Sequence, residues 1–225
     1  MKSNGDNIIM NRELIIYGAG GAGRELAFSL SLETNKNNKW QLLGFVDDDQ
    51  SLWNKKINGL PVMGGIEWLG GYGGNVAITT VGDPKIKRRI VNQLKKNNII
   101  FPRIVGPNSV ISSFVEWGEG CIVALSFNWI SPNVKLGDFV FINCSTRIGH
   151  DVSIGDFTTI FSDIDVSGGA KIGSNCVIGT GVTINPMVEI GDGVIIGAGS
   201  VVSKDIPPNV VAAGVPARVI REIVK

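Results

Sequence analysis

The sequence predicts two units of different fold class, a small α/β domain over residues 1–103 and an all-β solenoid over residues 104–225. Two observations predict this division. Strand-like and helix-like segments alternate up to Arg103, which is typical of an α/β domain with a parallel sheet. After that residue, aliphatic side chains recur every six positions, which is typical of a solenoid of short stacked strands. A length of 225 residues accommodates both units.

The α/β domain is expected to begin with a strand, a glycine turn and a helix. The short apolar run 14–17 ends in the glycine turn 18–23, and the helix-compatible segment 24–30 follows. Two further strands and a basic helix are expected over residues 42–46, 76–81 and 85–96. This order of elements favours a parallel sheet with helices against it.

The second unit repeats with a period of six residues. Thirteen aliphatic residues lie in unbroken steps of six: Ile130, Leu136, Ile142, Ile148, Ile154, Ile160, Val166, Ile172, Ile178, Ile184, Ile190, Ile196 and Val202. The pattern extends back to Val105 with one extra residue before Ile130, so that seventeen hexads make nearly six coils. We expect the aliphatic residue of each hexad to point inward. The pattern resembles the left-handed parallel β-helix of the hexapeptide acyltransferases, in which three hexads form one coil.

Composition limits the class of partner and the compartment. Lys and Arg number 21 against 20 Asp and Glu, a balance that argues against a nucleic-acid partner. The three cysteines are widely spaced and the first twelve residues lack an apolar signal-peptide core, so we expect a reduced cytoplasmic protein. Glycine or a charged residue interrupts every long apolar stretch, so no membrane span is expected.

The glycine turn and the acidic strand end predict a nucleotide site. Gly18, Gly20 and Gly23 follow a strand and open a helix, which places backbone amides where they can meet a phosphate. Asp47 and Asp48 end the next strand, near where a carboxylate accepts hydrogen bonds from a ribose or another sugar. The short domain has room for one mononucleotide-binding half, which favours a nucleotide or nucleotide sugar over a dinucleotide. A tight strand-to-helix turn with solvated acids is the alternative interpretation.

The chain contains a single histidine, His150, in the solenoid. One histidine excludes a three-histidine zinc site, and the sequence also lacks the G-x-S-x-G elbow of serine hydrolases. At three hexads per coil, the column through His150 contains Pro132, Gly168 and Pro186. Stacked strands lie about 4.8 Å apart, so a general base at His150 has a glycine one coil above it, with a free amide and no side chain to block a substrate. A surface histidine in a turn is the alternative interpretation.

Three motifs together resemble the sugar O- and N-acetyltransferases of the sialic-acid and bacillosamine type. They are the glycine turn 17–25, the strand end 45–49 and the solenoid segment 148–157, and the resemblance covers about residues 13–220. It implies a Rossmann-like, nucleotide-sugar-binding N-terminal domain followed by a left-handed β-helix. It also implies a homotrimer, with active sites between adjacent β-helices. The implied reaction transfers an acetyl group from acetyl-CoA, as cosubstrate, to the amino group of a nucleotide-linked amino sugar.

The resemblance assigns roles to residues of this sequence. The general base falls on His150, its acidic partner on Asp151 and the oxyanion-binding amide on Gly168. The nucleotide-sugar contacts fall on Gly20, Gly21, Ala22, Asp47, Asp48 and Gly82, and the CoA contacts on Thr159, Thr180 and Ala198. Ala22 and Thr159 stand where relatives often have histidine. No metal is implied.

We expect direct transfer, in which His150 takes a proton from the attacking amine and the Gly168 amide stabilises the tetrahedral oxyanion. A cysteine acyl-enzyme is less favoured, because Cys121 and Cys176 are expected to point inward and Cys144 lies on another face than His150. Acetylation of a sugar hydroxyl by the same fold and base stays open. So do two other classes of function: a nucleotide-binding oxidoreductase whose solenoid serves only assembly, and a non-catalytic scaffold.

A trimer is also expected from exposed apolar surface. Phe139, Phe157 and Phe161 are placed by the repeat on flat faces of the solenoid, where we expect neighbouring copies to cover them.

Overall fold

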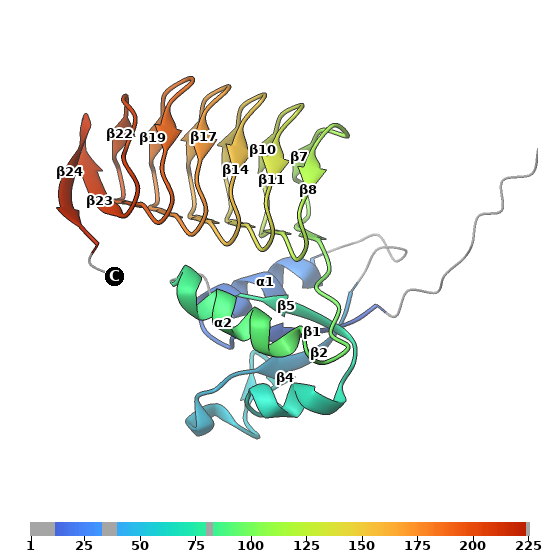
Figure 1. Cartoon of the computed structure of the whole chain (residues 1–225). Helices are drawn as coiled ribbons and strands as arrows, with labels where there is room; N and C mark the ends of the chain where they lie inside the picture. The colour runs from blue at the N-terminus through green and yellow to red at the C-terminus, as the bar shows by residue number, and fades with distance from the viewer. Residues whose placement is uncertain (1–11, 33–39, 80–82, 224–225) are drawn as a thin grey trace, which may run out of the picture.

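The computed structural model describes residues 12–32, 40–79 and 83–223. Figure 1 shows an N-terminal α/β domain lying against one side of a solenoid whose coils stack in chain order. The first solenoid strand begins at Ile104. In these described ranges, no helix is long and apolar enough to cross a membrane.

A three-stranded parallel sheet forms the centre of the α/β domain, in the order β2-β1-β5. Its strands and the two α-helices of the domain are β1 (Glu13–Tyr17), α1 (Gly21–Ser31), β2 (Gln41–Val46), β5 (Asn75–Ile78) and α2 (Pro84–Leu94). β5 ends before the predicted residue 81. The residue after it, Thr79, instead bonds through its hydroxyl to the carbonyl oxygen of Tyr17 at 2.8 Å.

Smaller elements complete the domain: η1 (Gln50–Leu52), β3 (Lys56–Ile57), β4 (Leu60–Pro61) and η2 (Ile66–Gly71). β3 and β4 form an antiparallel hairpin.

The glycine turn allows α1 to lie close to β1. A Cβ atom at Gly23 would overlap the carbonyl oxygen of Gly18 and lie 3.1 Å from the Thr79 hydroxyl. Any larger residue at position 23 would therefore push the helix off the strand. At Gly20 and Gly21 a Cβ atom would meet nothing within 4 Å, so the N-terminus of α1 faces open space.

Seventeen two-residue strands, β6 to β22, form three parallel sheets that are the faces of the solenoid. The docking face, which the α/β domain covers, has β6 (Ile104–Val105), β9 (Ile122–Val123), β12 (Phe141–Ile142), β15 (Thr159–Ile160), β18 (Val177–Ile178) and β21 (Ile195–Ile196). The middle face has β7 (Val110–Ile111), β10 (Trp129–Ile130), β13 (Arg147–Ile148), β16 (Asp165–Val166), β19 (Thr183–Ile184) and β22 (Val201–Val202).

The charged face has β8 (Glu116–Trp117), β11 (Lys135–Leu136), β14 (Ser153–Ile154), β17 (Lys171–Ile172) and β20 (Glu189–Ile190). An antiparallel hairpin, β23 (Val210–Gly214) and β24 (Ala217–Glu222), extends the docking face after the last coil. The chain passes from docking face to middle face to charged face in each coil, so the cross-section is a triangle with three corners.

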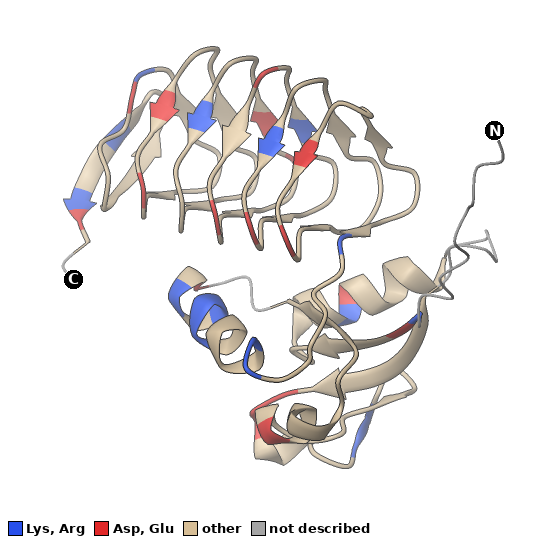
Figure 2. Cartoon of the chain, turned by 45° about the vertical axis from the view of Figure 1, so that its right-hand side comes forward, with Lys and Arg blue, Asp and Glu red and all other residues tan. Residues whose placement is uncertain are grey.

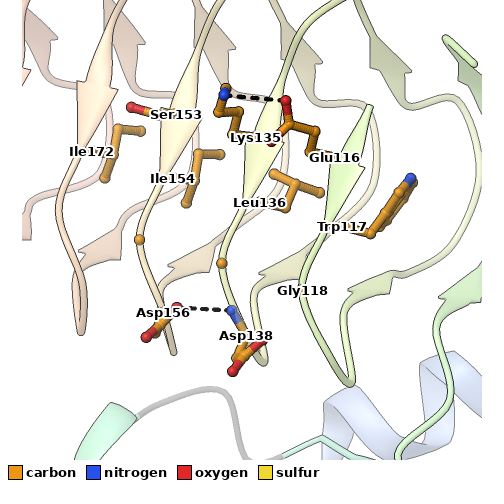
Figure 3. A pocket seen from close by; sticks show the side chains of 12 residues that line it. Glu116, Trp117, Gly118, Lys135, Leu136, Asp138, Ser153, Ile154, Asp156 and Ile172 are labelled. Atoms are coloured by element: carbon orange, nitrogen blue, oxygen red, sulfur yellow. Dashed lines mark hydrogen bonds and ion pairs between the residues drawn. The ribbon is translucent and has the colours of Figure 1, made fainter. Parts of the chain in front are cut away.

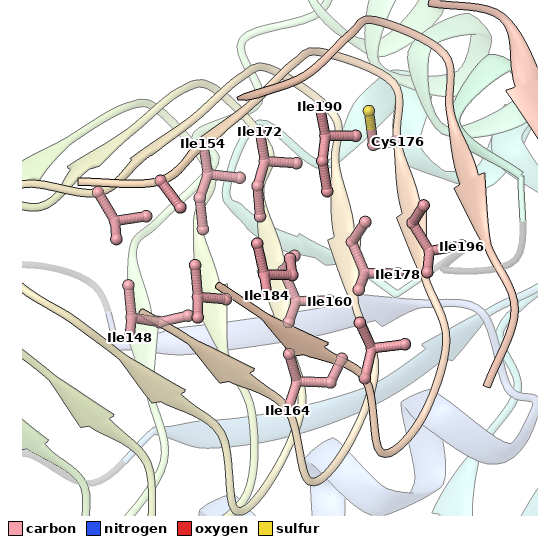
Figure 4. Packing of buried hydrophobic residues seen from close by; sticks show 14 of the residues in the cluster. Ile148, Ile154, Ile160, Ile164, Ile172, Cys176, Ile178, Ile184, Ile190 and Ile196 are labelled. Atoms are coloured by element: carbon pink, nitrogen blue, oxygen red, sulfur yellow. The ribbon is translucent and has the colours of Figure 1, made fainter. Parts of the chain in front are cut away.

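The predicted aliphatic ladder forms the interior of the triangle. All thirteen residues of the ladder are buried. Figure 4 shows part of the ladder, with side chains such as those of Ile148, Ile160 and Ile172 directed toward one another. Each strand pairs with the strand three hexads further along the chain, as in Ile130 opposite Ile148. Ile111 lies opposite Ile130, which is three hexads and one residue away. The predicted extra residue therefore lies in the corner before β10.

Helix α2 joins the two domains through basic side chains. The Lys87 amine donates to the carbonyl oxygen of Phe139 at 3.1 Å and to the Thr159 hydroxyl at 3.2 Å. Arg88 donates to the Asn175 side chain at 2.9 Å, and Lys95 pairs with Glu119 at 2.7 Å. Figure 2 shows acidic corner residues of the solenoid on the side that faces this basic helix. These contacts position the α/β domain on the docking face.

The expectation that other copies cover the solenoid phenylalanines is wrong for two of the three. Phe139 and Phe157 stack on each other with ring centroids 5.1 Å apart, and both are buried. Arg88 lies over the Phe157 ring at 4.1 Å, and Phe101 meets Phe139 edge to face. The α/β domain of the same chain covers them, which periodicity in the solenoid alone did not indicate. Phe161 is half-buried against the solenoid core.

Candidate active site

His150 lies at the corner between the middle face and the charged face, here called the histidine corner (residues 149–152 and their equivalents in other coils). Its Nδ1 atom lies 2.7 Å from Oδ2 of Asp151, and 70% of its side chain is exposed in the single chain. The predicted stacking of Pro132, His150 and Gly168 in one column is confirmed. The backbone amide of Asp151 donates to the carbonyl oxygen of Pro132, and the backbone amide of Gly169 donates to the carbonyl oxygen of His150. The imidazole therefore projects from a rigid, stacked corner.

Gly168 lies directly over the imidazole. A Cβ atom on Gly168 would lie 2.6 Å from His150 Nε2, so only glycine leaves the ring in this position. The Gly168 amide has no hydrogen-bond acceptor among the described residues, whereas the Gly169 amide is taken by the His150 carbonyl. A side chain at Gly149 would crowd the Gly168 nitrogen at 2.7 Å. The three glycines thus leave one unpaired amide open beside the ring nitrogen.

Asp151 reaches His150 because the corner turns it back. Its φ of 58° is left-handed, which removes the alternation that would send neighbouring strand side chains to opposite faces. The hydrogen bond from His150, followed by one from the Asn133 amide at 3.0 Å, lowers the pKa of the Asp151 carboxyl. An ionised carboxylate only accepts hydrogen bonds, so Nδ1 of a neutral His150 carries the proton and Nε2 carries the lone pair.

The predicted nucleotide residues gather at the carboxyl edge of the parallel sheet. Asp47 accepts a hydrogen bond from the Ala19 amide of the glycine turn at 2.8 Å, and Asp48 accepts one from the Tyr17 hydroxyl at 2.7 Å. Burial and the bond to Asp48 raise the pKa of Tyr17. Gly20 and Gly21 are exposed, whereas Ala22 packs partly against the domain core. Gly82 lies outside the described residues.

The three predicted CoA residues differ in exposure. Thr180 and Ala198 are exposed and stack at the corner between docking and middle faces, here called the threonine corner. The Gly199 amide donates to the Thr180 carbonyl at 2.8 Å, which fixes the two coils in register. Thr159 is fully buried, and its hydroxyl accepts a hydrogen bond from Lys87. Its side chain is not free to meet a cosubstrate, because α2 covers it.

A groove of about 640 Å³ runs between the start of α2 and the docking face. Val177 and Ile195 form its solenoid wall, one and two coils beyond Thr159 in the same column. Asp83 and Lys85 border it from the α/β domain. The groove therefore combines an apolar wall with charged groups next to the carboxyl edge of the sheet.

A second hollow, of about 460 Å³, lies on the charged face and contains none of the predicted site residues. Figure 3 shows that its polar groups serve the solenoid: Glu116 pairs with Lys135 at 3.1 Å, and Asp156 accepts the Asp138 amide at 2.9 Å. These four residues therefore pair within the solenoid.

Two of the three cysteines are unsuited to nucleophilic catalysis. Burial raises the pKa of Cys121 and of Cys176 to about 11, so both remain thiols at neutral pH. In residues 12–32, 40–79 and 83–223, no group of three or more His, Cys, Asp or Glu could hold a metal ion.

Comparison with known proteins gives a match for each domain. Residues 13–94 match the family model of the PglD N-terminal domain, and residues 169–204 match the bacterial transferase hexapeptide model of six repeats. A solved point mutant of perosamine N-acetyltransferase from Caulobacter crescentus, in complex with CoA and GDP-perosamine, is 26% identical. It superimposes with a TM-score of 0.84 over 93% of this chain and 97% of that one.

The acetyltransferase domain of PglB from Neisseria gonorrhoeae FA1090 is 28% identical, with a TM-score of 0.81 over 93% of this chain and all of that one. These matches indicate a sugar acetyltransferase with hexapeptide repeats. The predicted fold class, including the left-handed β-helix, is confirmed for this acetyltransferase. A curated relative, galactoside O-acetyltransferase of Escherichia coli strain K12, is 88% identical over 26 residues, which span 12% of this chain and 13% of that protein.

Sequence reasoning about this acetyltransferase missed two residues beside its predicted site, Asn133 and Lys87. Asn133 is one coil below Asp151, so counting three hexads back from the acid would have found it. Lys87 belongs to a basic stretch that resembles an ordinary solvated helix face, and only the docking of α2 reveals that it is buried.

Proposed function

We propose that the protein transfers the acetyl group of acetyl-CoA to the amino group of a nucleotide-linked amino sugar. The observation that carries the proposal is the arrangement of His150, Asp151 and the unpaired Gly168 amide at one corner. The neighbours support it further, since one was solved with CoA and GDP-perosamine and another with acetyl-CoA.

His150 acts as the general base. With its Nδ1 proton held by Asp151, its Nε2 lone pair takes a proton from the sugar amine as the amine attacks the thioester carbonyl. The new N–C bond forms as the carbonyl π electrons move onto oxygen, which becomes the oxyanion. The Gly168 amide donates to that oxygen. Collapse of the intermediate restores the carbonyl, breaks the C–S bond and releases the CoA thiolate, which takes the proton from the His150 imidazolium and so regenerates the neutral base.

Acetyl-CoA binds along the threonine corner and the groove beside α2. Thr180 and Ala198 lie in one exposed column, and the apolar wall of Val177 and Ile195 runs parallel to it. The glycine turn, with Asp47 and Asp48, holds the nucleotide sugar at the start of α1. This division assigns the acceptor to the α/β domain and the donor to the solenoid.

One chain cannot complete the site. The α/β domain covers the docking face, whereas the histidine corner is the corner of the triangle that does not border this face. The whole solenoid therefore lies between the glycine turn and His150 of the same chain. A sugar held by one copy must meet His150 of another.

A homotrimer with the middle faces toward its axis satisfies this requirement. The middle face borders both the histidine corner and the threonine corner, so a cyclic arrangement brings one copy's His150 to the next copy's Thr180 and Ala198. The middle face also carries the exposed apolar residues Val110 and Trp129, at 53% and 56% exposure, beside one ion pair between Arg147 and Asp165, whereas the charged face carries two ion pairs.

The test compares matched acceptors. Purified protein with acetyl-CoA is given nucleotide-linked amino sugars and the same sugars with a hydroxyl in place of the amine, and CoA release is measured. We expect release with the amine only. Equal release with the hydroxyl would establish O-acetylation, which the short match to galactoside O-acetyltransferase keeps as second candidate. No release with either, and no thermal stabilisation near the ~2.7 kcal/mol expected at 100 times Kd, would overturn the proposal.

A further inference from the structure

We infer that Asn133 is a positioning residue that fixes the orientation of Asp151 and, through it, the tautomer of His150; this inference rests on the proposed function. The observation is a continuous hydrogen-bonded chain across two coils. The Asn133 amide donates to Oδ1 of Asp151 at 3.0 Å, and Oδ2 of Asp151 lies 2.7 Å from His150 Nδ1.

The solenoid itself builds this chain. Asn133 and Asp151 occupy the same corner position in adjacent coils, with φ angles of 62° and 58°. The Asp151 amide donates to the carbonyl of Pro132, which locks the two turns together. Both side chains therefore leave the backbone in the same direction, one above the other. This places the side-chain amide of Asn133 within hydrogen-bond distance of the Asp151 carboxylate.

Asp151 needs this support because the corner is open to solvent. Its side chain is 57% exposed, and a carboxylate with a single side-chain partner in water rotates between partners. Asn133 occupies Oδ1 with a neutral donor, which leaves Oδ2 for the imidazole. A cationic donor in this place would compete with His150 for the carboxylate, whereas an amide orients it and leaves its charge intact.

The single histidine allows a direct test without substrate. Protein labelled with ¹⁵N-histidine gives signals from His150 alone, and the two ring nitrogens report which one carries the proton. The test variant is Asn133→Gly, because glycine keeps the left-handed turn and removes only the amide. The control is Asn108→Gly, which alters another left-handed asparagine in the first coil.

For the wild type and Asn108→Gly, we expect His150 to be protonated at Nδ1 in the neutral form. In Asn133→Gly the Nε2-protonated tautomer should gain population, and kcat should fall on the order of 10-fold, with KM within about twofold. An unchanged tautomer in Asn133→Gly would overturn the inference, whatever happens to kcat. If the tautomer shifts as expected but no acetyl transfer is found in the wild type, the proposed function fails and the positioning role stands.

Discussion

At the residue scale, the candidate site depends on glycines that have no side chain as much as on the side chains of His150 and Asp151. Three glycines in two coils leave a ring nitrogen and an unpaired backbone amide side by side, and Asp151 holds the ring from behind. Hydrogen bonds from His150 and Asn133 lower the pKa of the Asp151 carboxyl, so Asp151 is ionised at neutral pH and acts only as an acceptor.

His150→Asn is expected to remove turnover and leave binding intact. Asparagine keeps polarity and approximate size but has no basic nitrogen, so kcat should fall by about 10²–10⁴ with KM for both substrates little changed. Steady-state kinetics of the wild type and the variant with both substrates would measure this loss. A variant that keeps more than about a tenth of kcat would exclude His150 as the base.

Gly168→Ala is expected to displace the imidazole. The added methyl would lie 2.6 Å from His150 Nε2, and because that ring is largely exposed, it can move aside at small cost in folding stability. We therefore expect a Tm close to that of the wild type and a kcat lowered by about 10-fold or more. A large loss of Tm with normal kcat per folded molecule would contradict this interpretation.

At the element scale, α2 connects the two domains through the amine of Lys87, whose buried position disfavours its charged form. Lys87 is 1% exposed, and burial lowers its pKa to about 7. Its two hydrogen-bond partners, the Phe139 carbonyl and the Thr159 hydroxyl, are neutral. Thr159, which the sequence resemblance assigns to CoA, thus accepts a hydrogen bond from a lysine of the other domain.

Stability is expected to rise with pH from about 7 to about 10. In this range the unfolded chain keeps the Lys87 proton, at its ordinary pKa of about 10.4, while the folded chain has lost it, so unfolding becomes harder by at most ~1.4 kcal/mol per pH unit. Below pH 7 both forms are protonated and this contribution is constant. Urea unfolding at fixed protein concentration should show this slope in the wild type and in Lys85→Met, an exposed control on the same helix, but not in Lys87→Met. An equal slope in all three would show that Lys87 is charged when folded.

At the scale of the whole molecule, the triangular solenoid keeps the α/β domain and His150 of one chain on opposite sides. The α/β domain covers one face and His150 projects from the opposite corner, so assembly is part of the chemistry in the proposed function. Light scattering at micromolar concentration should give three times 24.0 kDa. A fully active monomer would contradict both the homotrimer and the shared site.

Mixed trimers test the shared site directly. His150→Asn and Asp47→Asn should each be nearly inactive alone, since one lacks the base and the other weakens acceptor binding. Co-assembled in equal amounts, they should recover about a quarter of the sites, because each site takes His150 from one copy and Asp47 from another at random. Activity in the mixture equal to the mean of the two separate variants would place both residues of a site in one chain.

The sequence by itself determined the solenoid, its extra residue before Ile130 and the strand–glycine turn–helix unit. Each of these follows from local rules: a period of six, a residue with no Cβ where a helix approaches a strand, and inward aliphatic side chains. It also predicted His150, Asp151 and Gly168 as one group, because a fixed coil length of three hexads turns sequence distance into spatial contact. Their catalytic roles stay predictions, as do the cytoplasmic location and the absence of a nucleic-acid partner.

The tertiary structure alone decided how the two domains meet. Repeats specify a prism but not which of its faces another domain covers, since docking depends on contacts between residues as far apart as Lys87 and Thr159. This is why Phe139 and Phe157, expected on a surface between copies, are buried under α2 instead. It is also why the separation of His150 from the glycine turn, on which the proposed shared site rests, became visible only in three dimensions.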